Sequence, residues 1–341
     1  MKKSFFIIML CALYLGSCGT DSPFEDLIKG GSEDVYIAGY VIPDMDMNMF
    51  AVYWKNGEII PLTDGTQDAE AVHISVTGND VHVYGVERIS LGEGYSTSLF
   101  RHWKNGKVVS DNDFDMSHIR DMAISGSDIY IVGTEYRNVT INKASYWKNG
   151  KEVVLTSDNN KKERAEAIFV SGNDVYVAGI EFIYGSWGIP KYWKNGEEIY
   201  ISDYKVATII KSIFVSGNDV YIAGYEYADI AKYWKNGKGV NLSTEDSRAN
   251  YIVVSGNDVY VAGQKWDKTL NASVATYWKN DREVRLSESS SRLYTLLVSG
   301  NDVYAVGESG YTPKYWKNGT EILLGKGAYY DSEFYSIAVK K

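Results

Sequence analysis

The chain has 341 residues and a formal net charge of −9, with 45% hydrophobic and 23% charged residues. This is the composition of a globular protein, and it excludes a disordered chain. The acidic excess, without a stripe of clustered lysine and arginine, argues against a nucleic-acid partner, because a phosphate backbone requires such a stripe.

The first residues have the pattern of a targeting segment. Lys2 and Lys3 form a positive start, and residues 5–15 are an apolar stretch too short to span a bilayer comfortably. The sequence Leu15-Gly16-Ser17-Cys18 then resembles a bacterial lipobox. The resemblance implies that residues 1–17 are a signal peptide and that Cys18 becomes the lipidated first residue. The alternative is an ordinary secretory signal with an incidental cysteine.

The lipobox also implies a location. Gly19 follows Cys18, and in similar lipoproteins a residue other than aspartate at this position permits export to the outer membrane. We therefore expect a protein of the bacterial cell envelope, surface-exposed or periplasmic, that meets the membrane only through several acyl chains. Residues 18–32 would be the lipidated cysteine and its tether, and residues 33–341 the folded domain. Because Cys11 leaves with the signal, the domain has no cysteine for a disulfide or a thiolate metal site.

Two phrases recur seven times in the predicted domain, at a spacing of roughly 38 to 49 residues that marks a repeat architecture. The tripeptide Trp-Lys-Asn begins at Trp54, Trp103, Trp147, Trp193, Trp234, Trp278 and Trp316. A phrase similar to SGNDVYVAG has its aspartate at Asp34, Asp80, Asp128, Asp174, Asp219, Asp258 and Asp302. Each repeat is therefore one structural unit.

The unit over residues 167–202 predicts four short antiparallel strands. An apolar run at 167–170 and the β-branched and aromatic run at 175–179 flank Ser-Gly-Asn-Asp, which is typical of a tight turn. After a variable loop, a third strand at 191–193 and an alternating outer strand at 198–201 flank Lys-Asn-Gly, a strong hairpin signal. The first two strands are apolar on both faces, so each sheet must be covered on both sides.

Seven small sheets covered on both sides satisfy that need when they are arranged radially, which predicts an all-β, seven-bladed β-propeller. An open solenoid is the alternative, but solenoids use shorter repeats. The first unit begins at Asp34 without an inner strand, and residues 334–339 repeat an inner strand and then stop. We expect this last strand to pair with the first blade and close the ring, which removes a free sheet edge.

The repeat resembles two known repeat families over residues 34–339. The order of strands and the glycine that ends the second strand are similar to Kelch propellers, although the paired glycines of Kelch repeats are missing. The phrases Tyr53-Trp54-Lys55-Asn56-Gly57 and Tyr315-Trp316-Lys317-Asn318-Gly319 look closer to the HAF-type extracellular repeats of bacteria. Both resemblances imply the propeller fold and say little of function, because propellers have many functions.

The repeated tryptophan is expected to pack between blades, since a ligand role would have to explain seven identical copies. Function is instead expected where the units differ, in the loops between second and third strands and between blades. Aromatic rings gather in these loops and suit sugar rings or protein interfaces. The candidate binding residues are Trp187, Trp266, Tyr184, Phe182, Tyr136, Tyr204, Tyr227, Tyr311, Tyr329 and Tyr330. Alternatively, these rings only cover the loop bases.

A glutamate recurs two positions after the glycine that ends the predicted second strand, at Glu87, Glu135, Glu181 and Glu226. Glu308 follows its glycine directly and is therefore shifted by one position. This recurrence favours a structural role, such as pairing with a neighbouring basic residue, over catalysis. Two acidic loops are weak calcium candidates, because alternating oxygen ligands suit Ca²⁺. Their residues are Asp44, Asp46, Asp111, Asp113 and Asp115, and solvated acidic loops are the favoured alternative.

Other chemistry has little support in the sequence. The four histidines, His73, His82, His102 and His118, show no metal-ligand spacing, and His82 and His102 stand where other units have tyrosine. No cofactor motif is present, and we expect no cofactor. The leading hypothesis is a non-enzymatic, lipid-anchored binding or scaffold protein that recognises a glycan or a protein. A propeller glycosidase or polysaccharide lyase, for which His118-Ile119-Arg120 is a weak local candidate, and a purely structural module are the alternatives.

Overall fold

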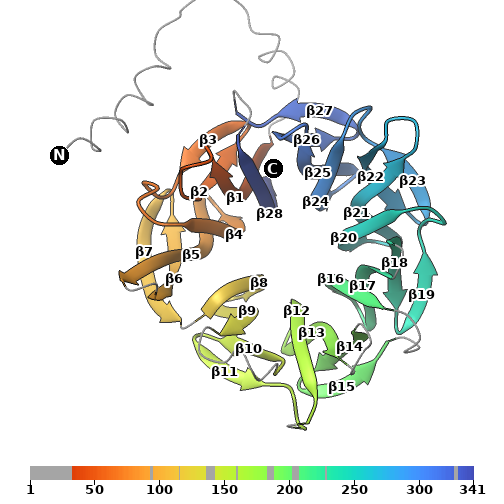
Figure 1. The fold of residues 1–341 in the computed structure, drawn as a ribbon, viewed down its shortest axis with the longest axis horizontal. Helices are drawn as coiled ribbons and strands as arrows, with labels where there is room; N and C mark the ends of the chain where they lie inside the picture. Colours follow the sequence, from red (N-terminus) through yellow and green to blue (C-terminus); the bar gives the residue numbers. More distant parts are fainter. Residues whose placement is uncertain are drawn as a thin grey trace, which may run out of the picture.

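The computed structural model describes residues 33–92, 95–114, 116–135, 143–158, 160–182, 188–201, 207–226, 229–325 and 329–341. Within these residues the chain is all-β and forms seven four-stranded antiparallel sheets. Figure 1 shows the sheets arranged radially as the blades of a propeller. In these described ranges no helix is long and apolar enough to cross a membrane. The predicted seven-bladed fold is confirmed.

The blades follow one another along the chain, and in blades two to seven the innermost strand comes first. Blade one contains β1 (Asp34–Ile42), β2 (Phe50–Lys55), β3 (Glu58–Pro61) and the last strand, β28 (Asp331–Lys340). Blade two contains β4 (Ala69–Thr77), β5 (Asp80–Gly92), β6 (Tyr95–Lys104) and β7 (Lys107–Phe114). Blade three contains β8 (Met116–Ser125), β9 (Asp128–Glu135), β10 (Ser145–Lys148) and β11 (Lys151–Val154). Blade four contains β12 (Lys162–Ser171), β13 (Asp174–Phe182), β14 (Ile189–Lys194) and β15 (Glu197–Tyr200).

The remaining blades repeat this order. Blade five contains β16 (Thr208–Ser216), β17 (Asp219–Glu226), β18 (Ile230–Lys235) and β19 (Lys238–Asn241). Blade six contains β20 (Ser247–Ser255), β21 (Asp258–Asp267), β22 (Ala272–Lys279) and β23 (Arg282–Arg285). Blade seven contains β24 (Ser291–Ser299), β25 (Asp302–Ser309), β26 (Thr312–Lys317) and β27 (Thr320–Leu323).

The two ends of the described chain meet in blade one. β28 pairs antiparallel with β1, from Asp34 opposite Lys340 to Ile42 opposite Asp331. In Figure 1 the dark blue β28 lies beside the red β1 at the inner edge of the ring. The predicted closure is therefore confirmed, and β1 has a partner on both sides.

The repeated Asn and Asp residues join the two tight turns of each blade. In blade four, Asn195 donates its side-chain N–H to the Asp174 carboxylate (2.7 Å), and the Val175 backbone N–H donates to the Asn195 side-chain oxygen (2.9 Å). Asn195 has a φ of 51°, a left-handed conformation that asparagine tolerates better than most residues. The same two bonds recur in the other six blades. Both turns therefore lie on one face of the ring, the turn face.

The lysine of the repeat belongs to the same arrangement. Lys194 pairs with Asp174 at 3.0 Å and lies 5.2 Å from the ring centre of Tyr176, the tyrosine of the SGNDVYVAG phrase. The loops between second and third strands and between blades lie on the opposite side, the loop face. The described chain starts and ends on the turn face, where Glu33 accepts a hydrogen bond from Tyr304 and lies 3.6 Å from Lys341.

The repeated tryptophans fill the spaces between blades, as predicted. All seven are buried, with at most 7% of the residue exposed. Trp193 of blade four packs with Val132, Ala144 and Leu155 of blade three. Trp54 of blade one packs with Tyr304 and other residues of blade seven, so the same contact crosses the closure.

The repeated glycine of each second strand faces a bulge in the inner strand, and the second strand continues beyond this glycine, in blade five to Glu226. In blade five the pairing shifts between Ile210 and Ser212, opposite Gly224. A Cβ atom at Gly224 would lie 2.0 Å from the carbonyl oxygen of Ile209, so no side chain fits there. The bulge inserts one extra residue into the inner strand, here Lys211, and re-aims its side chain.

Candidate functional site

Two pockets lie on the loop face beside the second and third strands of blade six. Because side chains alternate along a strand, β21 directs Gln264 and Trp266 toward blade seven and Lys265 and Asp267 toward blade five. The core shows which side chains face which blade: Ala262 packs with residues of blade seven, and Val261 packs with residues of blade five. A pocket lies on each side of this hairpin, and Trp266 lines both.

The larger pocket, named the 6–7 pocket, lies between blades six and seven and has a volume of about 410 Å³. Two aromatic residues, Trp266 and Tyr311, line it from different blades. The other lining residues are mainly small or polar: Gln264, Asn271, Ala272, Ser273, Ser290, Ser291, Arg292, Glu308 and Gly310. Flat rings combined with uncharged hydrogen-bonding groups are the features of a site for a polar ligand with apolar faces.

Tyr311 is held at the 6–7 pocket by an unusual turn. The β25–β26 hairpin closes through Gly310 and Tyr311, whose φ angles are 58° and 62°. A left-handed conformation costs a residue with a Cβ atom about 1–2 kcal/mol, and glycine or asparagine would avoid most of that cost. Tyr311 is nevertheless 64% exposed. The turn therefore presents an aromatic ring to solvent at the expense of backbone strain, which is a feature of functional positions.

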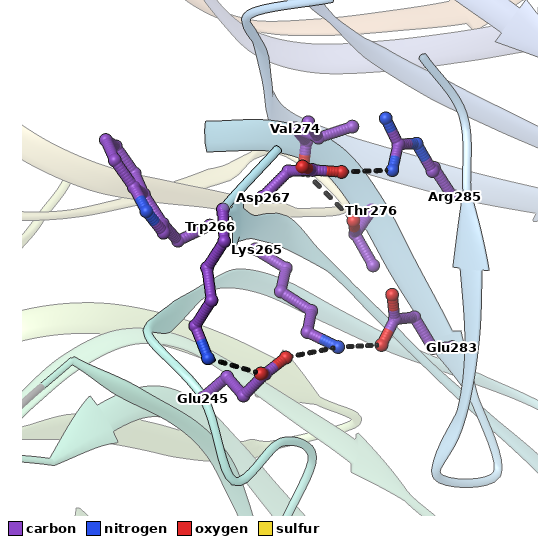
Figure 2. Close-up of a pocket in the computed structure, with 9 residues that line it drawn as sticks. Glu245, Lys265, Trp266, Asp267, Val274, Thr276, Glu283 and Arg285 are labelled. Carbon is purple, nitrogen blue, oxygen red and sulfur yellow. Dashed lines mark hydrogen bonds and ion pairs between the residues drawn. The ribbon is translucent and has the colours of Figure 1, made fainter. Parts of the chain in front are cut away.

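The smaller pocket, of about 210 Å³, is filled with ion pairs (Figure 2). Lys265 pairs with Glu245 (3.2 Å) and Glu283 (2.8 Å), and Arg285 pairs with Asp267 at 2.5 Å. In Figure 2 the Trp266 ring points away from these pairs. Since its charges already have partners, this pocket offers a ligand less than the 6–7 pocket does.

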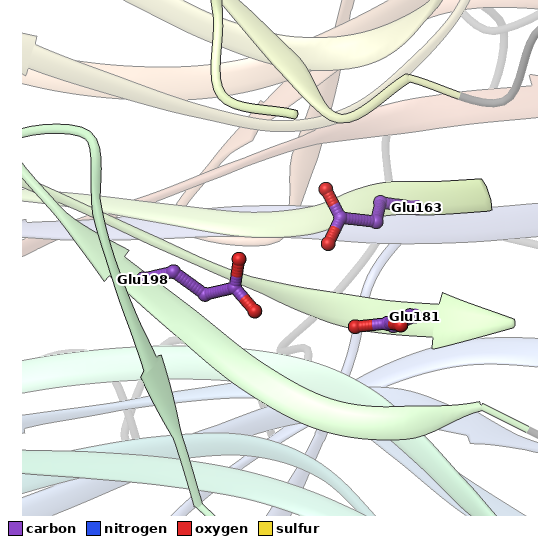
Figure 3. A group of neighbouring side chains, drawn as sticks. All are labelled: Glu163, Glu181 and Glu198. Atoms are coloured by element: carbon purple, nitrogen blue, oxygen red, sulfur yellow. The ribbon is translucent and has the colours of Figure 1, made fainter. Parts of the chain in front are cut away.

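A cluster of three glutamates on blade four is a structural ion-pair centre. Glu163, Glu181 and Glu198 converge from three strands, with carboxylate oxygens within 4.8 Å of one another (Figure 3). The fully buried ammonium of Lys191 contacts all three, at 2.6 Å from Glu163 and from Glu198. These hydrogen bonds raise the pKa of Lys191 against the effect of burial. The lysine thus occupies the position that a metal ion would need.

The recurring carboxylates whose side chains the structure describes are paired, as the structural interpretation predicted; the side chain of Glu135 lies outside the described part. Glu87 pairs with Arg101 (2.8 Å) and Glu226 with Lys232 (2.7 Å), each on the third strand of the same blade. Glu308, which is shifted by one position, faces the other way and pairs with Arg292 of the inner strand (2.7 Å). Burial raises the pKa of Glu308 although Arg292 opposes the shift.

Described aromatic candidates have three different environments. Trp266 and Tyr311 meet at the 6–7 pocket. Phe182 and Tyr329 pack against the core, which fits the alternative that some rings only cover loop bases. Tyr330 is 56% exposed but lines neither pocket. Five candidates and the lipidation residue lie outside the described residues: Trp187, Tyr184, Tyr136, Tyr204, Tyr227 and Cys18.

Among the calcium candidates, Asp44 and Asp46 are exposed in the β1–β2 loop. Asp111 and Asp113 lie on β7, and Asp115 falls outside the described residues. Within the part of the chain that the structure describes, one group of three carboxylates is close enough to share an ion. It is the cluster on blade four that Lys191 fills, and it contains none of the calcium candidates.

Strand pairing joins two histidines that the sequence spacing did not connect. His82 and His102 lie on neighbouring strands of blade two, with 2.9 Å between Nδ1 of His82 and Nε2 of His102. Their rings stack with centres 5.2 Å apart, and burial lowers the pKa of His102. Arg120, from the weak lyase candidate, pairs with Glu166 at 3.1 Å.

Buried polar groups on the inner strands form a feature that sequence reasoning missed. Asp121 accepts a hydrogen bond from the Ile168 backbone N–H of the next blade (2.9 Å), and burial raises its pKa to about 7. The Tyr335 hydroxyl lies 2.9 Å from Glu70 and 3.0 Å from Glu333, so it links the closing strand to blade two. The bonds of Asp121 to Ile168 and of Tyr335 to Glu70 cross between blades and favour a structural role. The sequence could have indicated these groups only if the position of the bulge in each inner strand had been known, because the bulge sets which side chains point inward.

Comparisons with known proteins show the fold and nothing finer. No family model matches the chain, and no curated protein matches its sequence. The propeller domain of the Trilobed protease from Pyrococcus furiosus, described as having an open velcro topology, aligns with a TM-score of 0.54 and 14% identity, over 88% of this chain and 96% of that one. A proposed 6-phosphogluconolactonase from Bacteroides fragilis aligns with a TM-score of 0.51 and 11% identity, over 91% and 98%.

A sialidase from Trypanosoma rangeli gives a TM-score of 0.43 and 10% identity over 83% of this chain, which spans 56% of the length of that protein. At these identities the likeness concerns the backbone alone, and a shared fold does not imply a shared activity. The chain is similar to these proteins as a β-propeller.

Proposed function

We propose that this chain is a lipid-anchored binding protein of the bacterial cell envelope that recognises a glycan through the 6–7 pocket on its loop face. One observation carries the proposal: Trp266 and Tyr311, from different blades, line a single pocket together with uncharged polar residues. Sugar rings have apolar faces that stack on aromatic rings and hydroxyl groups that need hydrogen-bonding partners.

The position of the chain ends supports this arrangement. Residue Glu33 is held on the turn face, so a lipid on Cys18 would attach the ring from that side. The loop face, with the 6–7 pocket, would then point away from the membrane. The anchor is tested by replacing Cys18 with serine, after which the protein should leave the membrane fraction; retention of the variant there would contradict lipid anchoring.

Glycan binding is tested by screening the purified domain on an array of bacterial and host glycans, followed by calorimetry with the best ligand. We expect Trp266→Ala and Tyr311→Ala each to weaken binding by about tenfold or more, because each removes one of the two aromatic rings that line the pocket. Tyr330→Ala is the matched control, since that tyrosine is similarly exposed but lines neither pocket.

Equal losses in all three variants, or none, would contradict the assignment of this pocket. Chromatography of the mixture over time would show whether the bound glycan is cleaved, and cleavage would favour the enzymatic alternative. Capture of a protein without any glycan signal would favour the protein-binding alternative.

A further inference from the structure

Blade two differs from the other six blades at two repeated positions. The tyrosine of the SGNDVYVAG phrase and the tyrosine before the repeated tryptophan are histidines in this blade, His82 and His102. Every other blade has tyrosine at both positions, and the pairs are Tyr36 with Tyr53, Tyr130 with Tyr146, Tyr176 with Tyr192, Tyr221 with Tyr233, Tyr260 with Tyr277 and Tyr304 with Tyr315. Because both positions change together in a single unit, this exchange marks a candidate site.

The exchange gives up contacts that the tyrosine makes elsewhere. In five blades the hydroxyl of the first tyrosine lies 3.1–3.4 Å from the aspartate of the same turn. In all six tyrosine blades the lysine of the repeat lies over the ring of that tyrosine. His82 has no hydroxyl to reach Asp80, so packing of the turn does not explain why blade two carries histidines.

The two imidazole rings meet on the side of blade two that faces blade three. Val83 and Trp103 pack with residues of blade one. Since side chains alternate along a strand, His82 and His102 point the other way. Nδ1 of His82 lies 2.9 Å from Nε2 of His102. Tyr84 stacks on the His102 ring, with ring centres 4.3 Å apart, and thereby holds that ring in place.

Such a pair of nitrogens can hold either a proton or a transition-metal ion. One ring donates its N–H and the other accepts, so one lone pair already points at the partner ring. An ion with bonds of about 2.0 Å to two nitrogens at right angles holds them about 2.8 Å apart, close to the observed 2.9 Å. The rings would need to turn, but not to separate, for both lone pairs to meet at one ion.

The separation also indicates which ions suit the pair. A right angle at the ion is the geometry of square-planar Cu²⁺ or Ni²⁺, whereas tetrahedral Zn²⁺ would need nitrogens about 3.3 Å apart. The nearby carboxylate is already engaged, because Asp80 pairs with Lys104 at 2.7 Å and accepts a hydrogen bond from Asn105 at 3.0 Å. Both rings are only half-buried, so solvent can occupy the remaining positions around an ion.

We propose that His82 and His102 form a binding site for a divalent transition-metal ion, with both ring nitrogens as ligands. Cu²⁺ should bind most tightly, because it has the highest affinity for nitrogen ligands among the divalent ions of the first row. The site lies on blade two, away from the 6–7 pocket, and the inference does not depend on glycan binding.

The test titrates the untagged, chelator-treated protein with Cu²⁺ by calorimetry. Cys11 and Cys18 are replaced by serine in every sample, so that no thiolate binds copper. The double variant His82→Tyr with His102→Tyr restores the pair that the other six blades have, and we expect it to fold. It should bind Cu²⁺ at least about tenfold more weakly, since both ligands are lost. Excess Ca²⁺ should not compete, because Ca²⁺ prefers oxygen ligands.

Electron paramagnetic resonance of the Cu²⁺ sample identifies the ligands. The unmodified pair should show coupling to imidazole nitrogens, which the double variant loses. Each single exchange should lose most of the affinity, because one imidazole alone cannot chelate the ion. His118→Asn is the matched control, since it removes a histidine of another blade, and it should leave affinity and spectrum unchanged.

Melting curves establish that each variant is folded, and the single variants decide the outcome if the double variant is not. A variant without the histidine pair that keeps the affinity and the nitrogen coupling of the unmodified protein would overturn the inference. Absence of nitrogen-coupled copper in the unmodified protein would overturn it as well.

Discussion

Trp193 shows what the repeated tryptophan contributes at the scale of one residue. Its side chain is fully buried against the preceding blade. We expect Trp193→Ala to lower the free energy of unfolding by about 3–5 kcal/mol, the range for large aromatic truncations in cores. Trp193→Phe should cost less, since the indole N–H has no hydrogen-bond partner among the described residues. Denaturant unfolding of the two variants and the unmodified protein measures this.

An unchanged unfolding midpoint for Trp193→Ala would contradict the packing role, and a Phe variant as unstable as the Ala variant would show that the indole N–H matters.

The sequence indicated individual residues of the candidate site but not that they lie together. The sequence indicated Trp266 and Tyr311 because they are aromatic residues outside the repeat pattern. It gave no sign that they share a pocket, since that depends on how blade six faces blade seven. Nor did it reveal the strained turn at Tyr311, because Gly-Tyr is a weak turn signal compared with Asn-Gly.

At the scale of the strand, the bulge explains why each second strand has a glycine at the same position of the repeat. A Cβ atom at Gly224 would overlap the Ile209 carbonyl, whereas one at Gly217 in the tight turn would meet nothing within 4 Å. We expect Gly217→Ala to cost about 1–2 kcal/mol, from its positive φ alone. Gly224→Ala should cost more, about 3 kcal/mol, because the strand must move. Thermal melting of the pair tests this ranking, and the reverse order would contradict it.

The sequence showed which strand residues alternate between the two faces of a sheet. The carboxylate that departs from the shared position was the most informative of them. Glu87, Glu181 and Glu226 share a position and a structural role. Glu308 lies one residue earlier, so its side chain faces the other side of the sheet and meets Arg292. The sequence contained that shift, but its consequence depended on the partner strand β24, whose register the bulge sets.

For the whole molecule, the titratable groups predict how stability depends on pH. Burial raises the pKa of Glu70, Glu308 and Glu333, and that of Asp121 to about 7. The folded chain therefore binds more protons than the unfolded chain above the ordinary carboxyl values, and stability should rise as pH falls from 8 to about 5. Burial of His73, which lowers its pKa to about 4, opposes this rise below about 6.5.

The aspartates of the seven repeats act in the opposite direction. Hydrogen bonds from the paired asparagine and lysine lower their pKa values below the usual 3.8, so their contribution is complete above that value and is lost as the pH falls further. We expect the melting temperature to be highest near about pH 5. A melting temperature that rises steadily from pH 5 to 8 would contradict this.

The ring as a whole was predictable because the same sequence pattern occurs in seven similar units. Each Trp-Lys-Asn and each SGNDVYVAG phrase gives the same strand and turn signals, and the missing first strand indicated the closure. The loop face was less predictable, since each loop occurs once and its shape depends on neighbouring blades.

Lys341 ends on the same side of the ring as Glu33, 3.6 Å from it. A fluorescent protein or an affinity tag joined after Lys341 would consequently sit beside the turn face and leave the opposite surface unobstructed. Immobilising the domain through such a tag would orient every molecule alike on a sensor chip.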